Sequence, residues 1–284
     1  MKVLLTGAAG VLAQALLPLL EQEEGIELRL TDIQPVETDH PFVKADLARW
    51  DDVQGLCEDV DQVLHVAAIH PWKHYTPQQY LDCNIKGTYN LLEAAAKSEV
   101  QRVVYTSSIA AMGYAAESPR ELPFDETKPC EPTEGVYGIS KHAGEQFCRM
   151  FRRRDGLAYL VLRPGTFVPR DEDDADYGIG LLTHCVHVGD VAAAHLLALR
   201  SDLEDETFVI AAKTPFTRDD GPALAEDAPA VVLEHFPEAA KLEELGIELP
   251  QHIRRCYAID KAEKLLGYKP QHNFAQWLQR KLEA

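Results

Sequence analysis

The 284-residue sequence lacks the features that mark membrane and secreted proteins. No apolar run approaches the roughly 20 residues that a membrane-spanning helix needs. Met1 leads directly into a strand-like run, without a cleavable signal pattern. The cysteines are scattered and form no Cys-x-x-Cys pair, which is typical of reduced thiols rather than of a disulfide framework. We therefore expect a cytoplasmic protein with no membrane partner.

Basic residues are also scarce. Lys and Arg total 28 against 46 Asp and Glu, which gives a formal net charge of −18. Such an acidic chain should repel nucleic acid and anionic membranes, so we expect neither as a partner. The length and the 46% hydrophobic content suffice for one large domain, or for a domain with a smaller lobe. Solubility or a salt-rich habitat would also explain the charge, which does not identify a substrate.

The N-terminal stretch has the pattern of a dinucleotide-binding unit. Residues 2–6 predict a strand, Gly7-Ala8-Ala9-Gly10-Val11-Leu12-Ala13 a tight turn, and residues 11–20 a helix. Glycines at such a junction let the backbone approach a pyrophosphate, whose charge the amides at the helix N-terminus can meet. A second strand, 27–31, closes on Asp32, where a carboxylate can hold both ribose hydroxyls and would repel a 2′-phosphate. We therefore predict NAD rather than NADP, with Asp32 as a simple turn residue the alternative.

Three later strands also end in residues that could line a ligand. Asp46-Leu47 follow a strand at 42–44 and could edge the adenine. Ala67-Ala68 end a strand at 62–68, and their small side chains leave room for a flat ligand. Ser107-Ser108 stand at the end of a strand at 103–107. Because open parallel sheets bind ligands at the carboxyl ends of their strands, these residues should meet the glycine turn and Asp32 in one crevice.

Tyr137-Gly138-Ile139-Ser140-Lys141 is the stretch that most suggests chemistry. Residues four apart on a helix share a face, so the phenol of Tyr137 and the ammonium of Lys141 can address one site. A free tyrosine, with a pKa of about 10, is a poor base at neutrality, but a neighbouring lysine cation favours the phenolate. Tyr137 is thus a candidate acid/base for a hydroxyl proton. Alone, these residues would also suit an ordinary amphipathic helix; the dinucleotide pattern upstream favours the catalytic interpretation.

Short motifs continue in a fixed order along nearly the whole chain: Thr6-Gly7-x-x-Gly10-x-x-Ala13, Asp46-Leu47, His65-x-Ala67-Ala68, Asn84-x-x-Gly87-Thr88, Ser107-Ser108, Tyr137-x-x-x-Lys141, Arg163-Pro164-Gly165, Val188-x-Asp190-Val191-Ala192 and Asp260-x-x-Lys264 with Leu266-Gly267-Tyr268-x-Pro270. In this order the sequence resembles the extended short-chain dehydrogenase/reductase family, the NAD-dependent epimerase/dehydratase group. The resemblance implies an α/β fold, a Rossmann-type doubly wound parallel sheet with a small C-terminal substrate-binding lobe, and NAD as the cofactor.

The resemblance also implies roles for individual residues. Ser108 would polarise the substrate oxygen, Tyr137 would transfer the proton, and Lys141 would hold the nicotinamide ribose. Asn84 would support the site, and Pro164 would lie near the nicotinamide.

The reaction stays open within the family. Sugar-nucleotide dehydratases carry an acidic pair after the serine or threonine, where this chain has Ile109 and Ala110, so we do not expect dehydration. Sugar-nucleotide epimerases grip the nucleotide with a long segment that here, at 166–186, is short and resembles the trimmed version in uronate dehydrogenases. The asparagine that those enzymes carry beside the serine is Ile109 here, and Arg170 is the nearest candidate for their carboxylate clamp. Ser107-Ser108-Ile109-Ala110 also resembles hydroxysteroid dehydrogenase-type members, which favours an apolar substrate.

We therefore predict an NAD-dependent oxidoreductase that transfers hydride at a secondary alcohol or ketone of a sugar-like or other small hydroxy substrate. A sugar-nucleotide epimerase with tightly held NAD is one alternative. A non-catalytic dinucleotide sensor is another, although such sensors tend to lose the tyrosine and lysine that this chain keeps with Ser108.

Two histidine-rich stretches do not predict a metal site, and we expect none. Metal ligands must converge in space, whereas these residues lie partly on an alternating strand that divides them between two faces. The first stretch contains His65, His70 and His74, and the second contains His184, Cys185 and His187. The acidic run from Asp171 to Asp176 predicts a solvated loop, with screening of anionic substrates as the alternative.

We expect an NAD-binding domain at 1–213, with a substrate loop inserted at 166–187, and a substrate-covering lobe at 214–284, where prolines divide the chain into short helical pieces such as 238–245. Helices are also predicted at 51–57 and 84–96, a helix end at 196–200 and a last strand at 206–211. In related enzymes the helix starting at Asn84 and the one carrying Tyr137 often pair with a twofold mate, so we predict a homodimer. Apolar side chains that could serve this interface, or equally the core, are Cys148, Met150 and Phe151.

Overall fold

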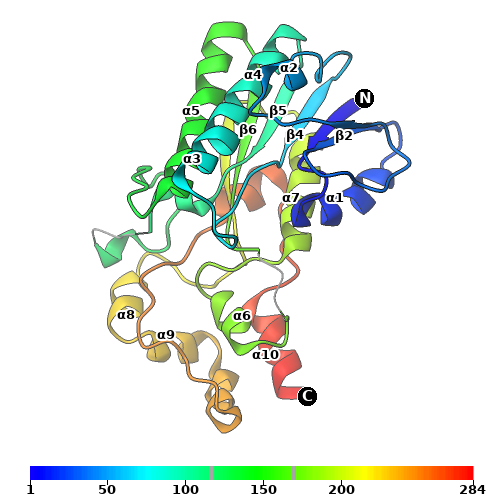
Figure 1. Cartoon of the computed structure of the whole chain (residues 1–284). Helices are drawn as coiled ribbons and strands as arrows, with labels where there is room; N and C mark the ends of the chain where they lie inside the picture. Colours follow the sequence, from blue (N-terminus) through cyan, green and yellow to red (C-terminus); the bar gives the residue numbers. More distant parts are fainter. Residues whose placement is uncertain (115–117, 168–170, 284) are drawn as a thin grey trace. The chain divides into compact units, whose positions relative to one another are not determined.

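The computed structural model describes residues 1–114, 118–167 and 171–283, and the chain divides into two compact units (Figure 1). Unit 1 comprises Met1–Gly113, Cys130–Arg163 and Ala192–Phe208. Unit 2 comprises Tyr114–Pro129, Pro164–Val191 and Val209–Ala284. Unit 2 thus contains the whole predicted lobe at 214–284 together with earlier segments, and the covering role of that lobe stays a prediction.

Within the described residues, seven strands form one sheet in the order β3-β2-β1-β4-β5-β6-β7. Neighbouring strands from β3 to β6 are all parallel. The order reverses between β1 and β4, and such a switch point is where open α/β sheets bind ligands. The predicted doubly wound parallel sheet is confirmed. The strands are β1 (Lys2–Thr6), β2 (Glu27–Asp32), β3 (Phe42–Lys44), β4 (Gln62–His65), β5 (Arg102–Thr106), β6 (Ala158–Pro164) and β7 (Glu206–Ile210).

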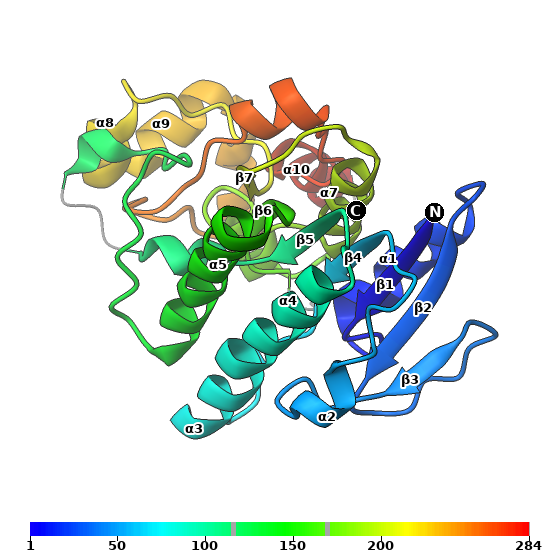
Figure 2. The same cartoon turned by 90° about the horizontal axis from the view of Figure 1, so that it is seen from above.

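Helices cover both faces of the sheet in unit 1, with α2, α4 and α5 on one side and α1 and residues 192–200 of α7 on the other (Figure 2). Strands β4, β5 and β6 are buried along their whole length, as expected for parallel strands covered on both faces. No helix in the described part of the chain is long and apolar enough to cross a bilayer. The helices are α1 (Val11–Glu21), α2 (Trp50–Val53), α3 (Pro77–Tyr80), α4 (Gly87–Lys97), α5 (Val136–Asp155), α6 (Ala175–Gly180), α7 (Val188–Arg200), α8 (Gly221–Glu226), α9 (Ala228–His235) and α10 (Phe274–Glu283).

The helix that was predicted to open at Asn84 begins earlier, at Pro77. Thr76 and Gln79 form a reciprocal capping box, in which each side chain accepts the other residue's backbone N–H. The helix then continues through a π-helical turn, Leu81–Lys86, into α4. Asn84 therefore lies inside a helix, in a widened turn of the kind that is frequent at functional sites.

Two further predicted elements are shorter in the structure. The helix predicted at 51–57 ends at Val53. The strand predicted to reach Ala68 ends at His65, because the N–H groups of Val66 and Ala67 donate to the hydroxyl of Thr6 rather than to a neighbouring strand. These hydrogen bonds hold Val66 and Ala67 next to Thr6, the residue that precedes the glycine turn.

Unit 2 is built from short helices around aromatic side chains. Phe274 and Trp277 of α10 are buried, and α6 packs so closely on α10 that a Cβ at Gly178 would overlap the Trp277 ring. The predicted piece at 238–245 is a 3-10 segment, Pro237–Leu245. The acidic side chains from Asp171 to Asp174 are exposed, as expected for a solvated loop, and Asp174 caps α6 by accepting the N–H of Asp176.

Candidate active site

The glycine turn joins β1 to α1 in a conformation that requires glycine. Gly7 has φ of 73°, and a Cβ there would lie 2.7 Å from Cα of Ala67. The N–H of Gly10 donates to the Gly7 carbonyl at 2.8 Å, and α1 starts at Val11 without a side-chain cap. Ala9, Gly10 and Val11 are exposed, whereas Leu12 is buried behind them. The first amides of α1 can therefore meet an anion, as predicted for a pyrophosphate.

Asp32 lies beside this turn. One carboxylate oxygen accepts the N–H of Ala9 at 3.0 Å, and the other accepts the N–H of Gln34 at 2.8 Å. The side chain is only partly buried, so it can also be reached by a ligand. The fold thus brings the acidic residue that ends β2 to the glycine turn, where the sequence argument for a ribose contact requires it.

Two other predicted cofactor-binding stretches follow the carboxyl ends of β3 and β4. Asp46 is partly buried and accepts the N–H of Ala48 at 2.9 Å. Leu47 is buried, and its carbonyl accepts a hydrogen bond from Asn90 of α4 at 2.8 Å. Ala67 is partly buried and Ala68 exposed after β4.

Lys141 is a charged residue that the fold buries. It is 3% exposed, and its Nζ donates to the carbonyl of Thr106, the last residue of β5, at 2.8 Å. Burial lowers the pKa of Lys141 to about 8, because the ammonium loses its water shell. The helix α5 therefore places a buried cation at the carboxyl end of β5.

Tyr137 precedes Lys141 by one helical turn and is half-buried. Its ring meets His70 edge to face, with centroids 4.9 Å apart, and Tyr80 at 6.2 Å. Burial, and to a smaller extent the positive charge of Lys141, lowers the pKa of His70 to about 4. Spacing in the sequence did not indicate His70 or Tyr80, which reach Tyr137 from the segment after β4 and from α3.

Ser108 follows β5 and caps a 3-10 turn, Ile109–Met112. Its hydroxyl oxygen accepts the N–H of Ala110 at 3.1 Å, which leaves the hydroxyl hydrogen available to donate to a substrate oxygen. Ile109 and Ala110 are buried and cannot exchange protons.

Asn84 connects the segment after β4 to the helix of Tyr137. Its side chain accepts the N–H of Ile69 at 2.9 Å and donates to the carbonyl of Ile69 at 3.1 Å. It also donates to the hydroxyl of Ser140 at 3.0 Å, and Ser140 in turn donates to the carbonyl of Tyr137. This network ties the helix that carries Tyr137 to the loop after β4.

The hydroxyl of Ser107 is engaged inside unit 1. It donates to Glu145 at 2.6 Å, and Glu145 forms a buried two-point ion pair with Arg163. The side chain of Ser107 therefore stabilises a buried carboxylate. Pro164, the remaining predicted cofactor-binding residue, closes β6 and belongs to unit 2. Arg170 lies outside the described residues.

Neither histidine-rich stretch of the sequence forms a metal-ligating group by itself. Among the described residues, Glu172, His187 and His272 bring potential ligand atoms within 4.8 Å of one another. However, Nδ1 of His187 accepts the N–H of Gly189, so Nε2 carries the proton and donates it to Glu172. The ring is therefore set for a hydrogen bond rather than for a metal ion.

A second group of potential ligands, Cys130, His142 and Glu145, lies in unit 1. The guanidinium of Arg163 contacts both Cys130 and Glu145 and would repel a metal cation.

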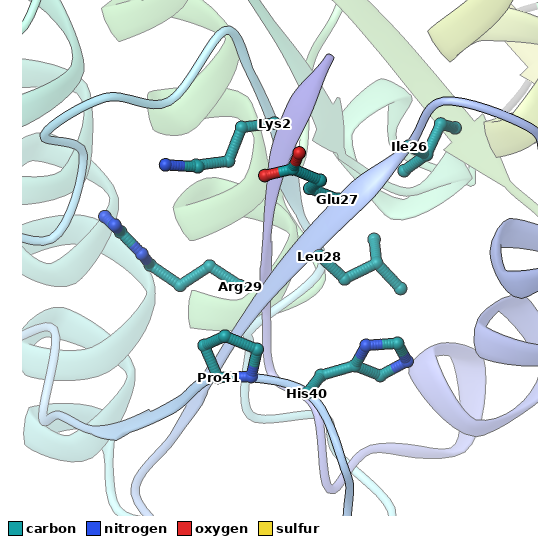
Figure 3. A pocket seen from close by; sticks show the side chains of 7 residues that line it. All are labelled: Lys2, Ile26, Glu27, Leu28, Arg29, His40 and Pro41. Atoms are coloured by element: carbon teal, nitrogen blue, oxygen red, sulfur yellow. The ribbon is translucent and has the colours of Figure 1, made fainter.

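A separate hollow of about 460 Å³ opens at the amino ends of β1 and β2 (Figure 3). In this close-up the side chains of Lys2 and Arg29 point to one side of β2, and those of Leu28 and His40 to the other. Since open α/β sheets bind ligands at the carboxyl ends of strands, we assign this hollow no part in the site.

A parallel sheet with a glycine turn at its switch point and an acidic residue closing β2 defines a dinucleotide-binding protein of the Rossmann type. Comparison with known proteins places it more narrowly. The model of the NAD dependent epimerase/dehydratase family matches residues 3–177, and the chain belongs to that family. The predicted family is confirmed.

Curated relatives include dehydrogenases of two kinds. The uronate dehydrogenase of Pseudomonas syringae pv. tomato is 33% identical over 176 residues, which cover 61% of this chain and 62% of that protein. The match thus spans less than two thirds of this relative. The decarboxylating sterol-4-alpha-carboxylate 3-dehydrogenase of Candida albicans is 30% identical over 281 residues, covering 81% of this chain and 78% of that protein.

The fold is shared with solved structures. A short-chain dehydrogenase/reductase superfamily protein from Agrobacterium tumefaciens, solved with bound NAD, superposes with a TM-score of 0.75 at 21% identity over 100% of this chain and 96% of that chain.

Proposed function

We propose that the protein is an NAD-dependent oxidoreductase that moves hydride between the nicotinamide and a secondary alcohol or ketone of a sugar-like or other small hydroxy substrate. The observation that carries the proposal is the burial of Lys141. This residue lies one helical turn after Tyr137, and its ammonium donates to the carbonyl of Thr106. Burying an ammonium destabilises the folded state. A catalytic requirement for a cation beside an acid/base accounts for keeping Lys141 at this position.

The residues present fit NAD. The glycine turn offers exposed backbone at the N-terminus of α1, and Asp32 stands beside it as an acceptor for ribose hydroxyls. NAD, when bound, supplies the hydride acceptor. Within the described residues of unit 1, the carboxylate of Asp32 is the group that would oppose the extra phosphate of NADP.

The chain's own residues then handle the proton. Tyr137 as phenolate takes the proton of the substrate hydroxyl, and the Lys141 ammonium lowers the cost of that phenolate. Ser108 donates its hydroxyl hydrogen to the same substrate oxygen, and this bond strengthens as the carbon–oxygen bond gains carbonyl character. Asn84 and Ser140 hold the backbone of Tyr137 in place.

The substrate class is narrowed by chemistry and by relatives. Ile109 and Ala110 exclude the elimination step of dehydratases, because neither can carry a proton. The uronate and sterol-carboxylate dehydrogenases among the relatives make free sugar acids and hydroxysteroids the first compounds to test. We also propose a homodimer in the cytoplasm with a small molecule as its partner.

A sugar-nucleotide epimerase with tightly held NAD is the second candidate. It is favoured by a putative UDP-glucose 4-epimerase of Methanocaldococcus jannaschii, 29% identical over 226 residues. The two reactions differ in their products, since a dehydrogenase releases NADH whereas an epimerase regenerates NAD within each turnover.

The test is a screen of free uronates, aldoses, hydroxysteroids and UDP-sugars with NAD, read by NADH absorbance and by chromatography of the sugars. NADH formation supports the dehydrogenase, and a changed sugar without NADH supports the epimerase. Binding of NAD without turnover of any compound would favour the sensor.

Tyr137→Phe then tests the assignment of the acid/base. Turnover should fall by ~10²–10⁴-fold, the usual contribution of a positioned acid/base, while the affinity for NAD changes little. Tyr89→Phe, which removes a phenol hydroxyl from α4, is the matched control and should keep parental turnover. Parental turnover in Tyr137→Phe would overturn the mechanism.

A further inference from the structure

His65 is a buried titratable residue that the mechanism above does not use. It is the last residue of β4 and is 1% exposed. Its Nδ1 lies 2.9 Å from the hydroxyl oxygen of Thr6, and its Nε2 lies 3.0 Å from that of Thr88. The imidazole therefore bridges the strand that leads into the glycine turn and the helix α4.

The direction of these hydrogen bonds follows from their surroundings. The Thr6 oxygen already accepts the N–H groups of Val66 and Ala67, each at 3.2 Å, so its own hydrogen points to Nδ1 of His65. Burial, assisted by the charge of Lys141, lowers the pKa of His65 to about 3. The ring is thus neutral, Nδ1 accepts, and Nε2–H donates to Thr88.

The network continues to the catalytic helix. The ring of His65 packs against that of Tyr105, with centroids 5.5 Å apart, and the Tyr105 hydroxyl donates to the carbonyl of Lys141 at 3.4 Å. Tyr105 is held tightly against α5, because a Cβ at Gly144 would overlap its hydroxyl. A series of contacts therefore runs from Thr6, beside the glycine turn, through the rings of His65 and Tyr105 to the backbone of Lys141.

We propose that His65 is a positioning residue that couples the cofactor-binding turn to Lys141. Through Thr6 it fixes the peptides of Val66 and Ala67, against which Gly7 packs. The bond to Thr88 holds the ring of His65 against Tyr105, and through Tyr105 it fixes the peptide of Lys141. The inference deepens the proposed function and rests on it, because the spacing matters only if a cofactor and a phenolate share this site.

The experiment compares His65→Phe, His65→Gln, Thr88→Val and the double variant His65→Phe/Thr88→Val. Phenylalanine removes both hydrogen bonds, whereas glutamine keeps one acceptor and one donor. The control is Gln62→Leu, since Gln62 is also buried on β4 and accepts hydrogen bonds from Arg102 at the amino end of β5, the end opposite to Lys141. Each protein is judged by its melting temperature, its turnover with the compound found in the screen, and the pH dependence of that turnover.

We expect His65→Phe to lower kcat by about 10–100-fold with little change in KM, because a small displacement of Lys141 weakens its support of the phenolate. Thr88→Val should act alike, the double variant should be no worse than His65→Phe, and His65→Gln should recover part of the loss. The ionisation seen in the pH profile should move upward in His65→Phe. The control should lose stability without moving the profile.

A second readout does not need a substrate. Phenolate absorbance at high pH, taken as the difference between each protein and its Tyr137→Phe counterpart, reports the ionisation of Tyr137 directly. Its midpoint should rise in His65→Phe and in Thr88→Val. If the parent turns over no compound, the proposed function fails while this titration still decides the role of His65.

Parental kcat and a parental phenolate midpoint in folded His65→Phe would overturn the proposal. Strictly additive effects in the double variant, or the same change in Gln62→Leu, would also overturn it, because both indicate a general loss of core packing. If His65→Phe does not fold, His65→Gln and Thr88→Val are judged by the same criteria.

Discussion

Relative to the parent, the free energy of unfolding of Lys141→Met should increase as the pH falls. The side chain is 3% exposed and burial lowers its pKa from 10.5 to about 8. The folded state therefore holds the proton less tightly than the unfolded chain does, and the parent loses stability by keeping Lys141 charged at neutral pH. Between about pH 8 and 10.5 the unfolded chain binds more protons, so the parent's stability rises with pH in that window.

The magnitude follows from the two pKa values. Since a pKa change of one corresponds to about 1.4 kcal/mol, the ionisation of Lys141 costs the folded state about 3 kcal/mol at pH 7. At pH 9.5 the cost falls to about 1.4 kcal/mol, so the parent should gain about 2 kcal/mol over Lys141→Met between these pH values. Methionine also removes the hydrogen bond to the Thr106 carbonyl, at about 1–3 kcal/mol, but this loss is the same at both pH values.

Urea unfolding of the parent and Lys141→Met at pH 7 and pH 9.5 measures the difference directly. Groups that titrate in both proteins cancel in the comparison. Lys86→Met, an exposed position in the π-helical turn, serves as the control and should track the parent. Parallel pH dependence of the parent and Lys141→Met would show that Lys141 is not desolvated, and would remove the main support of the proposed mechanism.

Three further outcomes are expected. Calorimetry should show NAD binding at least tenfold tighter than NADP, about 1.4 kcal/mol, and Asp32→Ser should narrow the gap; equal affinities in the parent would contradict the role of Asp32. Gly7→Ala should weaken NAD binding and lower the melting temperature, because Gly7 has φ of 73° and a Cβ there would meet Ala67. The control, Gly156→Ala at an exposed position, should lower the melting temperature without changing NAD affinity, and unchanged NAD affinity in Gly7→Ala would refute a close approach of this backbone to the ligand. Light scattering at micromolar concentration should give a dimeric mass, and a monomeric mass would remove the homodimer.

The structure narrows the set of side chains that the sequence offered for a dimer interface. Cys148 and Phe151 of α5 are buried in the core of unit 1, so core packing uses them. Met150 is 36% exposed and Ile139 is 48% exposed on the same helix. A twofold interface would therefore draw on Ile139 and Met150.

The sequence by itself predicted the parts of the site whose requirements are local. Gly7 is needed because one residue must adopt a positive φ between a strand and a helix, and this follows from adjacent positions. Asp32 follows from the length of one strand–helix–strand unit, and Tyr137 with Lys141 from one helical turn. Thr76 and Gln79 have the spacing of a capping box, a local signal that would have predicted an earlier start than Asn84 for this helix.

Only the tertiary structure decided which side chains form hydrogen bonds with the buried polar groups around the site. The sequence offered His65 as a conspicuous histidine near two others, whereas its role depends on Thr6, 59 positions away, and on Thr88. The hydroxyl of Ser107 donates to Glu145, which pairs with Arg163, and neither partner follows from the position of Ser107 at the end of a strand. Hydrogen-bond partners of buried groups come from whichever elements the sheet brings together, so spacing along the chain cannot specify them.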